Sequence, residues 1–213
     1  MSGYVGDVAA LARKDVLLEL RSRDTLPALL LFVVSALVVF NFSLPAGSSS
    51  LAAYGLLWVA IVFTALLGLA RAFAAEREQR LLDGLVLAPC DRSAIWLGKG
   101  VSVFCLLVIA EAVALPAFAL FFAPVDATLI AAVLLADLGL ASVGTLLAAM
   151  AAASRARELL LPLLFLPLVI PLVVGGVGAT VAADPARYLG FLVLYDALFA
   201  ILSWATFEYV VTE

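Results

Sequence analysis

The chain has 213 residues, of which 66% are hydrophobic and only 13% are charged. A soluble domain has roughly 45–50% apolar and about 25% charged residues, so a water-soluble fold of this length could not cover so much apolar surface. The formal net charge of −4 says little, because in a membrane protein the placement of Lys and Arg decides orientation. No His is present, which removes the usual general base and the commonest metal and haem ligand.

The first 24 residues are polar and lack the apolar core of a cleavable signal peptide. Apolar residues recur there at three- and four-residue steps: Val5, Val8, Ala9, Ala12, Val16 and Leu20. Lys14 and Arg21 lie opposite, while Glu19 interrupts the apolar stripe. We expect an amphipathic helix along the cytoplasmic leaflet; the alternative is a solvated tail.

Six stretches are long and apolar enough to cross a membrane, which needs ~20 such residues. They cover residues 25–42, 51–70, 101–122, 127–153, 159–183 and 188–211. The predicted fold class is therefore an all-α membrane protein with six transmembrane helices. Residues 1–24 would form the cytoplasmic helix, and residues 25–213 the permease domain with a cytoplasmic segment at 74–99.

Basic residues are distributed unevenly between the two sides. Eleven of the twelve lie in the amino-terminal segment, the second-to-third connection or the fourth-to-fifth connection, and only Arg187 lies in a connection of opposite parity. The positive-inside rule then places both termini and these connections in the cytoplasm.

The connection from Arg71 to Lys99 is far longer than the two to eight residues that join neighbouring helices. A charge-dense turn leads into an amphipathic run of leucines, Pro89 ends that helix, and Asp91 or Ser93 can cap a second short one. Such a segment predicts either a docking surface for a partner or plain packing on the bundle.

Three acidic residues fall near the middle of predicted spans: Glu111, Asp137 and Asp196. A carboxylate there costs roughly 2.5–3.5 kcal/mol unless it is protonated or partnered. We expect all three to face the bundle interior, protonated or hydrogen-bonded to backbone and hydroxyl groups. They would form either a substrate path or latch, or contacts that hold helices together. Glu208 lies near a helix end and is expected to reach the interface.

The fifth span contains Pro162, Pro167 and Pro171, each of which removes a backbone donor and favours a kink. It is a candidate hinge, or a kinked helix without motion. In the fourth span, Gly144, Ala148 and Ala152 form a small-residue stripe for close packing, for which a second permease subunit is one candidate. Cys90, Cys105 and Met150 form no recognisable ligand set, so neither a metal site nor a disulfide is predicted.

The sequence resembles the ABC-2 type exporter permeases, and within them the haem exporter B (CcmB) family of cytochrome c maturation. Several segments carry the resemblance in order along the chain: Trp58-Val59-Ala60, Arg71 and Phe73, EREQRLLDGLVLAP, DRSAIWLGK and RARELLLPLLFLPLVIPL.

The resemblance implies a non-catalytic permease in the bacterial inner membrane, with residues 76–99 acting as the coupling helix beneath which a separate ATPase docks. The implied interface residues are Glu76, Arg77, Glu78, Arg80, Leu81, Leu82, Asp83, Leu85, Pro89, Asp91 and Arg92. ATP would bind the ATPase, and haem would be ligated by partner subunits. The implied partners are a CcmA-like ATPase, CcmC-like and CcmD-like membrane subunits, a CcmE-like periplasmic haem chaperone, membrane lipid and a second copy of the chain, with no nucleic acid.

Three other interpretations remain open. The chain could be an ABC-2 permease for another cargo, such as a drug, a lipid or a glycan. It could be a scaffold without a transport cycle. An intramembrane enzyme is the least favoured, because the sequence has no His and no Ser/Lys or Asp/Asp motif.

Overall fold

The computed structural model describes residues 3–21, 25–45, 50–73, 91–154 and 157–212. Within these ranges the secondary structure consists of seven α-helices. They are α1 (Tyr4–Arg21), α2 (Thr25–Ser43), α3 (Ser50–Arg71), α6 (Arg92–Phe121), α7 (Ala127–Ala153), α8 (Arg157–Val181) and α9 (Pro185–Thr212). The predicted all-α class is confirmed.

Six of the described helices, α2, α3 and α6 to α9, are long and apolar enough to cross a membrane, so the chain is a multi-pass membrane protein. Five begin and end within a few residues of the predicted spans. The exception is α6, which begins at Arg92 rather than at residue 101. Asp91 caps it, since its carboxylate accepts from the Ser93 backbone N–H at 2.9 Å. The predicted separate short helix is wrong here, because the residues after Asp91 continue unbroken into the span.

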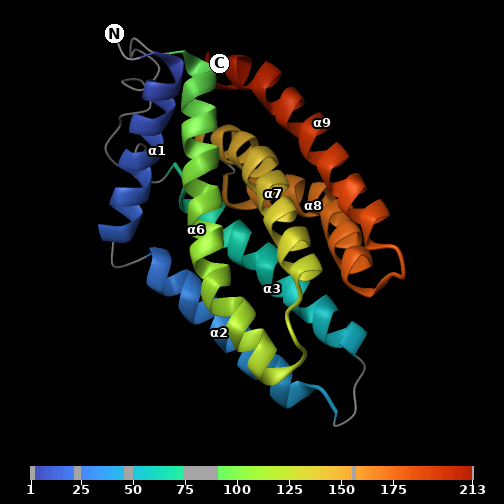
Figure 1. The fold of residues 1–213 in the computed structure, drawn as a ribbon. Helices are drawn as coiled ribbons and strands as arrows, with labels where there is room; N and C mark the ends of the chain where they lie inside the picture. Colours follow the sequence, from blue (N-terminus) through green and yellow to red (C-terminus); the bar gives the residue numbers. More distant parts are fainter. Residues whose placement is uncertain (1–2, 22–24, 46–49, 74–90, 155–156, 213) are drawn as a thin grey trace.

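Helix α7 occupies the centre of the bundle, where it packs against α6, α8 and α9 (Figure 1). It is the most enclosed of the spans, whereas α2 and α9 are the most exposed. Fully buried aromatic side chains fill the interior: Trp58, Phe118, Phe165 and Phe207. The apolar outer faces of α2 and α9 suit lipid, which is the solvent that the composition requires.

Helix α1 is ordered and packs along the first half of α6 (Figure 1), so the solvated-tail alternative is wrong. Its buried face is rotated from the predicted stripe. Ala12 is buried as expected, but Val5 and Leu20 are exposed, while the charged Asp15 is buried. Two neighbouring residues of α6 explain this rotation. Gly98 lets Leu11 approach closely, and Lys99 forms an ion pair with Asp15.

The small-residue stripe on α7 is used within the chain. A Cβ on Gly144 would overlap the side chain of Leu69 on α3, and Ala148 is buried. The suggestion that this stripe packs against a second subunit is therefore wrong for these positions, because α3 already lies on it.

Candidate functional site

Lys99 lies where three helices meet. It belongs to the third turn of α6, and it reaches both α1 and the end of α3. Only 4% of Lys99 and 6% of Asp15 are exposed, so both members of this ion pair are removed from water. We call Lys99, Asp15, Ala72 and Phe73 the Lys99 junction.

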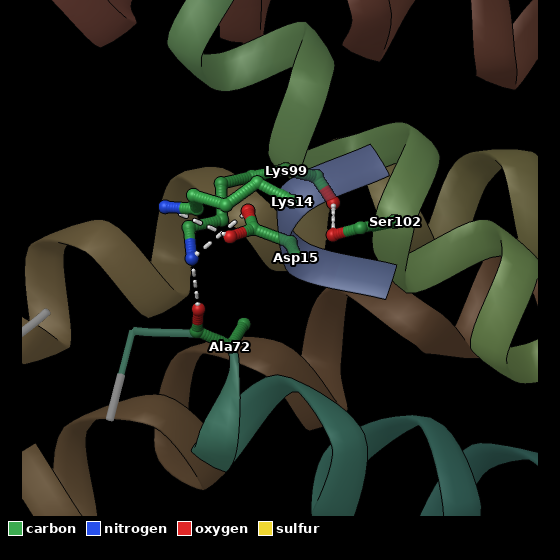
Figure 2. A network of polar contacts seen from close by, with 5 residues as sticks. All are labelled: Lys14, Asp15, Ala72, Lys99 and Ser102. Atoms are coloured by element: carbon green, nitrogen blue, oxygen red, sulfur yellow. Dashed lines mark hydrogen bonds and ion pairs between the residues drawn. The ribbon is translucent and has the colours of Figure 1, made fainter. Parts of the chain in front are cut away.

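Figure 2 shows the polar contacts of this junction. Lys99 Nζ lies 3.1 Å from Asp15 Oδ2 and donates to the Ala72 carbonyl oxygen at 2.6 Å. The ammonium also lies 5.0 Å from the centre of the Phe73 ring, within the range of a cation–π contact. One ammonium group on α6 therefore contacts both α1 and the two residues that follow α3.

Opposite charges explain why the pair can be buried. An isolated buried ammonium is costly, whereas one with a carboxylate, a carbonyl and a ring face recovers much of its lost hydration. Lys14 adds a second cation, 3.0 Å from Asp15 Oδ1, on the more exposed side. Removing one partner from such a pair is far more damaging than removing both.

A cavity of about 20 Å³ adjoins the junction, bordered by Glu19, Arg71 and Ser102 among others. This is room for roughly one water molecule. Glu19 Oε2 is buried there without a hydrogen-bond partner in the described part of the chain. A water in this cavity would satisfy that oxygen.

Most of the predicted ATPase-coupling residues, Glu76 to Pro89, lie outside the described residues. The last two can be placed at the start of α6. The side chain and backbone N–H of Ser93 donate to Asp91, and these bonds lower the pKa of that carboxyl. Arg92 lies 3.5 Å from Glu208 of α9, in an exposed contact. Glu208 is exposed near the end of α9, and its expected position at the membrane interface stays a prediction.

The three mid-span carboxyl groups are not brought together into one site. Glu111 on α6 and Asp137 on α7 are buried and interact with one another. Asp196 on α9 is half-buried and lies against Gly139. The inward orientation is confirmed for Glu111 and Asp137. The expected hydrogen bonds to backbone or hydroxyl groups are not found for any of the three among the described residues.

The candidate hinge prolines all lie inside one continuous helix, α8. The Tyr195 hydroxyl of α9 donates to the Leu168 carbonyl oxygen, between Pro167 and Pro171, at 2.7 Å. Where a proline disturbs the backbone ladder, such a side-chain bond can satisfy a displaced carbonyl. Glycines on the same helix allow close neighbours; for instance, a Cβ on Gly176 would overlap the buried Trp58 indole.

Sequence reasoning placed Lys99 in the cytoplasmic connection and did not identify its partner. The signal was present in Asp15, an acidic residue that lies three positions after the buried Ala12 on α1. Pairing it with Lys99 requires the packing of α1 on α6, which no local pattern specifies. In the described ranges, no three His, Cys, Asp or Glu side chains come together in a way that could hold a metal ion. Cys105 is a free thiol, and Cys90 lies outside these ranges.

Comparisons with known proteins place this arrangement in a family. The model of the CcmB protein family matches residues 7–209, from within α1 to within α9. Over 192 residues the chain is 32% identical to Heme exporter protein B of Paracoccus denitrificans, covering 86% of this chain and 88% of that protein. It is 31% identical over 172 residues to Heme exporter protein B of Rhodobacter capsulatus, covering 78% of this chain and 79% of that protein. The chain belongs to the CcmB protein family.

Proposed function

We propose that this chain is the membrane permease subunit of an ABC-type complex for haem export in cytochrome c maturation. Two relatives that match most of its length are named Heme exporter protein B, and six of its described helices are apolar enough to cross a membrane. It would hydrolyse nothing itself. A separate ATPase subunit would supply the energy, and partner subunits would ligate the haem.

The contacts of the Lys99 junction support a coupling mechanism. In the sequence, residues 74–90 connect Phe73, which follows α3, to Asp91, which precedes α6. Lys99 holds those two elements together through the Ala72 carbonyl, and holds α1 through Asp15. A push on the segment by an ATPase would therefore move α1, α3 and α6 as one body and bias a two-state bundle.

The proposed orientation has both termini in the cytoplasm of a bacterium and the bundle in its inner membrane. Eleven of the twelve basic residues support this arrangement, because they lie in segments that would face the cytoplasm. Residues 1–24 would form a cytoplasmic helix and residues 25–213 the permease domain. The proposed partners are an ATPase, other membrane subunits of cytochrome c maturation, a periplasmic haem chaperone, membrane lipid and a second copy of the chain.

Gentle extraction followed by identification of the accompanying proteins tests the assignment. We expect an ATPase together with cytochrome c maturation proteins and the haem chaperone. Recovery of an ATPase with a drug, lipid or glycan export partner would favour that cargo over haem. Recovery of the chain alone would contradict the proposal.

A charge reversal at Glu76, Arg77 and Glu78 tests the coupling segment. We expect Glu76→Lys/Arg77→Glu/Glu78→Lys to abolish ATP-dependent function while the membrane bundle still folds. The matched control is Arg187→Glu, a charge reversal at an exposed residue in the first turn of α9. Retention of full ATP-dependent function in the triple variant, with assembly intact, would favour a scaffold over a driven permease.

A further inference from the structure

Two acidic residues meet inside the hairpin formed by α6 and α7. Pro124 lies midway along the connection between these helices, and Glu111 and Asp137 each lie thirteen positions from it. Glu111 lies ten residues before the end of α6 and Asp137 ten residues after the start of α7, which at 1.5 Å per residue is about 15 Å along each helix axis from the turn. They therefore lie at one depth, within the ~30 Å hydrocarbon core of a bilayer.

Both side chains are enclosed and lack an ordinary partner. Glu111 is 5% exposed and Asp137 is completely buried. Their carboxyl groups interact with one another. None of their four oxygens accepts a hydrogen bond from a backbone, hydroxyl or cationic group in the described ranges.

No other titratable group of the described residues interacts with this pair. Helix α2 carries none, and those of α3 lie elsewhere: the Tyr54 ring packs against Phe118 in a tilted arrangement, and Arg71 borders the Lys99 cavity. On α9, Tyr195 donates to α8 and Asp196 lies against Gly139. The remaining titratable residues of the packed helices are Asp7, Arg13, Lys14, Asp15, Glu19 and Arg21 of α1, Tyr4 beside Ser93, Arg92, Lys99 and Cys105 of α6, Arg157 and Glu158 in the first turn of α8, and Arg187, Tyr188, Glu208 and Tyr209 near the ends of α9.

Two adjacent carboxylates in an apolar interior cannot both stay charged without a compensating positive charge. A calcium ion takes six to eight oxygen ligands, roughly, and magnesium about six. This pair offers at most four carboxyl oxygens, and no third acidic residue joins it in the described part of the chain. A proton needs only two oxygens. A carboxylic acid that donates to a neighbouring carboxylate forms one of the stronger hydrogen bonds found in proteins.

We propose that Glu111 and Asp137 form a proton-binding site in which one proton is shared between the two carboxyl groups and links α6 to α7. Loss of the proton leaves two like charges side by side, so the contact between these central helices weakens as the pH rises. The same α6 carries Lys99 twelve positions earlier, about 18 Å along the axis, so the site lies on the helix that carries the proposed coupling contact.

Infrared spectroscopy of the purified full-length chain tests the site without any activity. We expect the carbonyl stretch of a buried protonated carboxyl group that shifts in D2O and disappears in Glu111→Gln/Asp137→Asn. The matched control is Asp196→Asn, which removes another mid-span carboxyl and should leave this band in place. No such band in the native chain, or its loss in Asp196→Asn, would overturn the proposal.

Thermal unfolding as a function of pH provides a second readout. The midpoint of the native chain should fall by roughly 3–6 °C when the pH is raised until the shared proton leaves. The midpoint of Glu111→Gln/Asp137→Asn should lose this decrease, and Asp196→Asn should keep it. A midpoint of the native chain that follows the sodium or potassium concentration at fixed pH would overturn the proposal, because a metal cation would then occupy the site. The infrared comparison of the native chain with Asp196→Asn still decides the matter if the double variant does not fold.

Discussion

Helix α6 carries two buried ionisable residues whose surroundings differ. Lys99 is surrounded by a carboxylate, a carbonyl and an aromatic ring from α1 and the end of α3. Among the described residues, the titratable group that interacts with Glu111 is another acid, Asp137. A pair of opposite charges can serve as a permanent joint, whereas a pair of like charges depends on a proton that can leave. The role of a buried charged side chain therefore depends on the charge of its partner and not on its burial alone.

Removal of the Lys99 ammonium from the Lys99 junction should destabilise the chain more than any other substitution considered. Lys99→Met leaves Asp15 buried with only Lys14 beside it, so the free energy of unfolding should fall by about 3 kcal/mol or more. Thermal unfolding in detergent measures the loss. Glu111→Gln should be less damaging, because the new amide can donate to Asp137.

The control for Lys99→Met removes both charges together. Asp15→Leu/Lys99→Met should recover much of the lost stability, since no unpaired charge then remains in the interior. Equal stability of Lys99→Met and Asp15→Leu/Lys99→Met would show that the unpaired Asp15 is not the cause of the destabilisation. Lys99 would then not differ from Glu111 in the way described.

The next effect separates the packing of α1 from its charge. A Cβ on Gly98 would lie 2.8 Å from Leu11 Cβ, so Gly98→Ala should destabilise the chain by about 1–3 kcal/mol through displacement of α1. Gly100→Ala, two positions along the same helix, meets nothing closer than 3.9 Å and should be neutral or slightly stabilising. Equal midpoints for the two variants would show that α1 is not held by close packing.

A smaller effect concerns the cap that starts α6. Because the bonds from Ser93 lower the pKa of Asp91, the stabilisation is present above the ordinary pKa of an Asp and is lost as the pH falls through the folded value. Asp91→Ala should therefore be less stable than the native chain by about 0.5–1 kcal/mol near neutral pH. The difference should shrink below about pH 4. A difference that stays constant into strong acid would exclude the carboxylate as the cap.

The smallest effect is expected at the exposed pair between Arg92 and Glu208. Their groups are 3.5 Å apart and largely hydrated, so Glu208→Gln should change the stability by less than about 0.5 kcal/mol. A larger change, measured by the same unfolding assay, would mean that exposed pairs on α6 matter as much as buried ones. Burial would then not explain the difference in stability between the Lys99 pair and the Arg92 pair.

Composition and length were enough to predict the six spans, because lipid requires long apolar helices whatever their packing. The start of α6 was misplaced because hydropathy marks where apolar residues begin, at residue 101, and not where the helix begins. Asp91 was considered as a cap, but for a separate helix. Pro162, Pro167 and Pro171 were placed correctly in one span, although nothing local indicated that Tyr195 would donate between them.

The paired charges were harder to predict, because each joins elements far apart in sequence. Asp15 and Lys99 are brought together by the packing of α1 on α6. The Glu111 and Asp137 pair left a usable signal, since two acids at equal distances from the turn of an antiparallel hairpin lie at one depth. Whether they also face one another depends on helix rotation, which the even hydrophobicity around α6 and α7 does not fix.

In the proposed mechanism, the Lys99 junction transmits force from segment 74–90 to the bundle. The most direct test is the amount of ATP hydrolysed per haem delivered by the intact complex, compared between the native chain and Asp15→Leu/Lys99→Met. We predict that the double variant assembles and hydrolyses ATP but needs about 10-fold more of it, since the contacts of Lys99 with α1 and α3 are lost. An unchanged ratio in a correctly assembled complex would contradict the account.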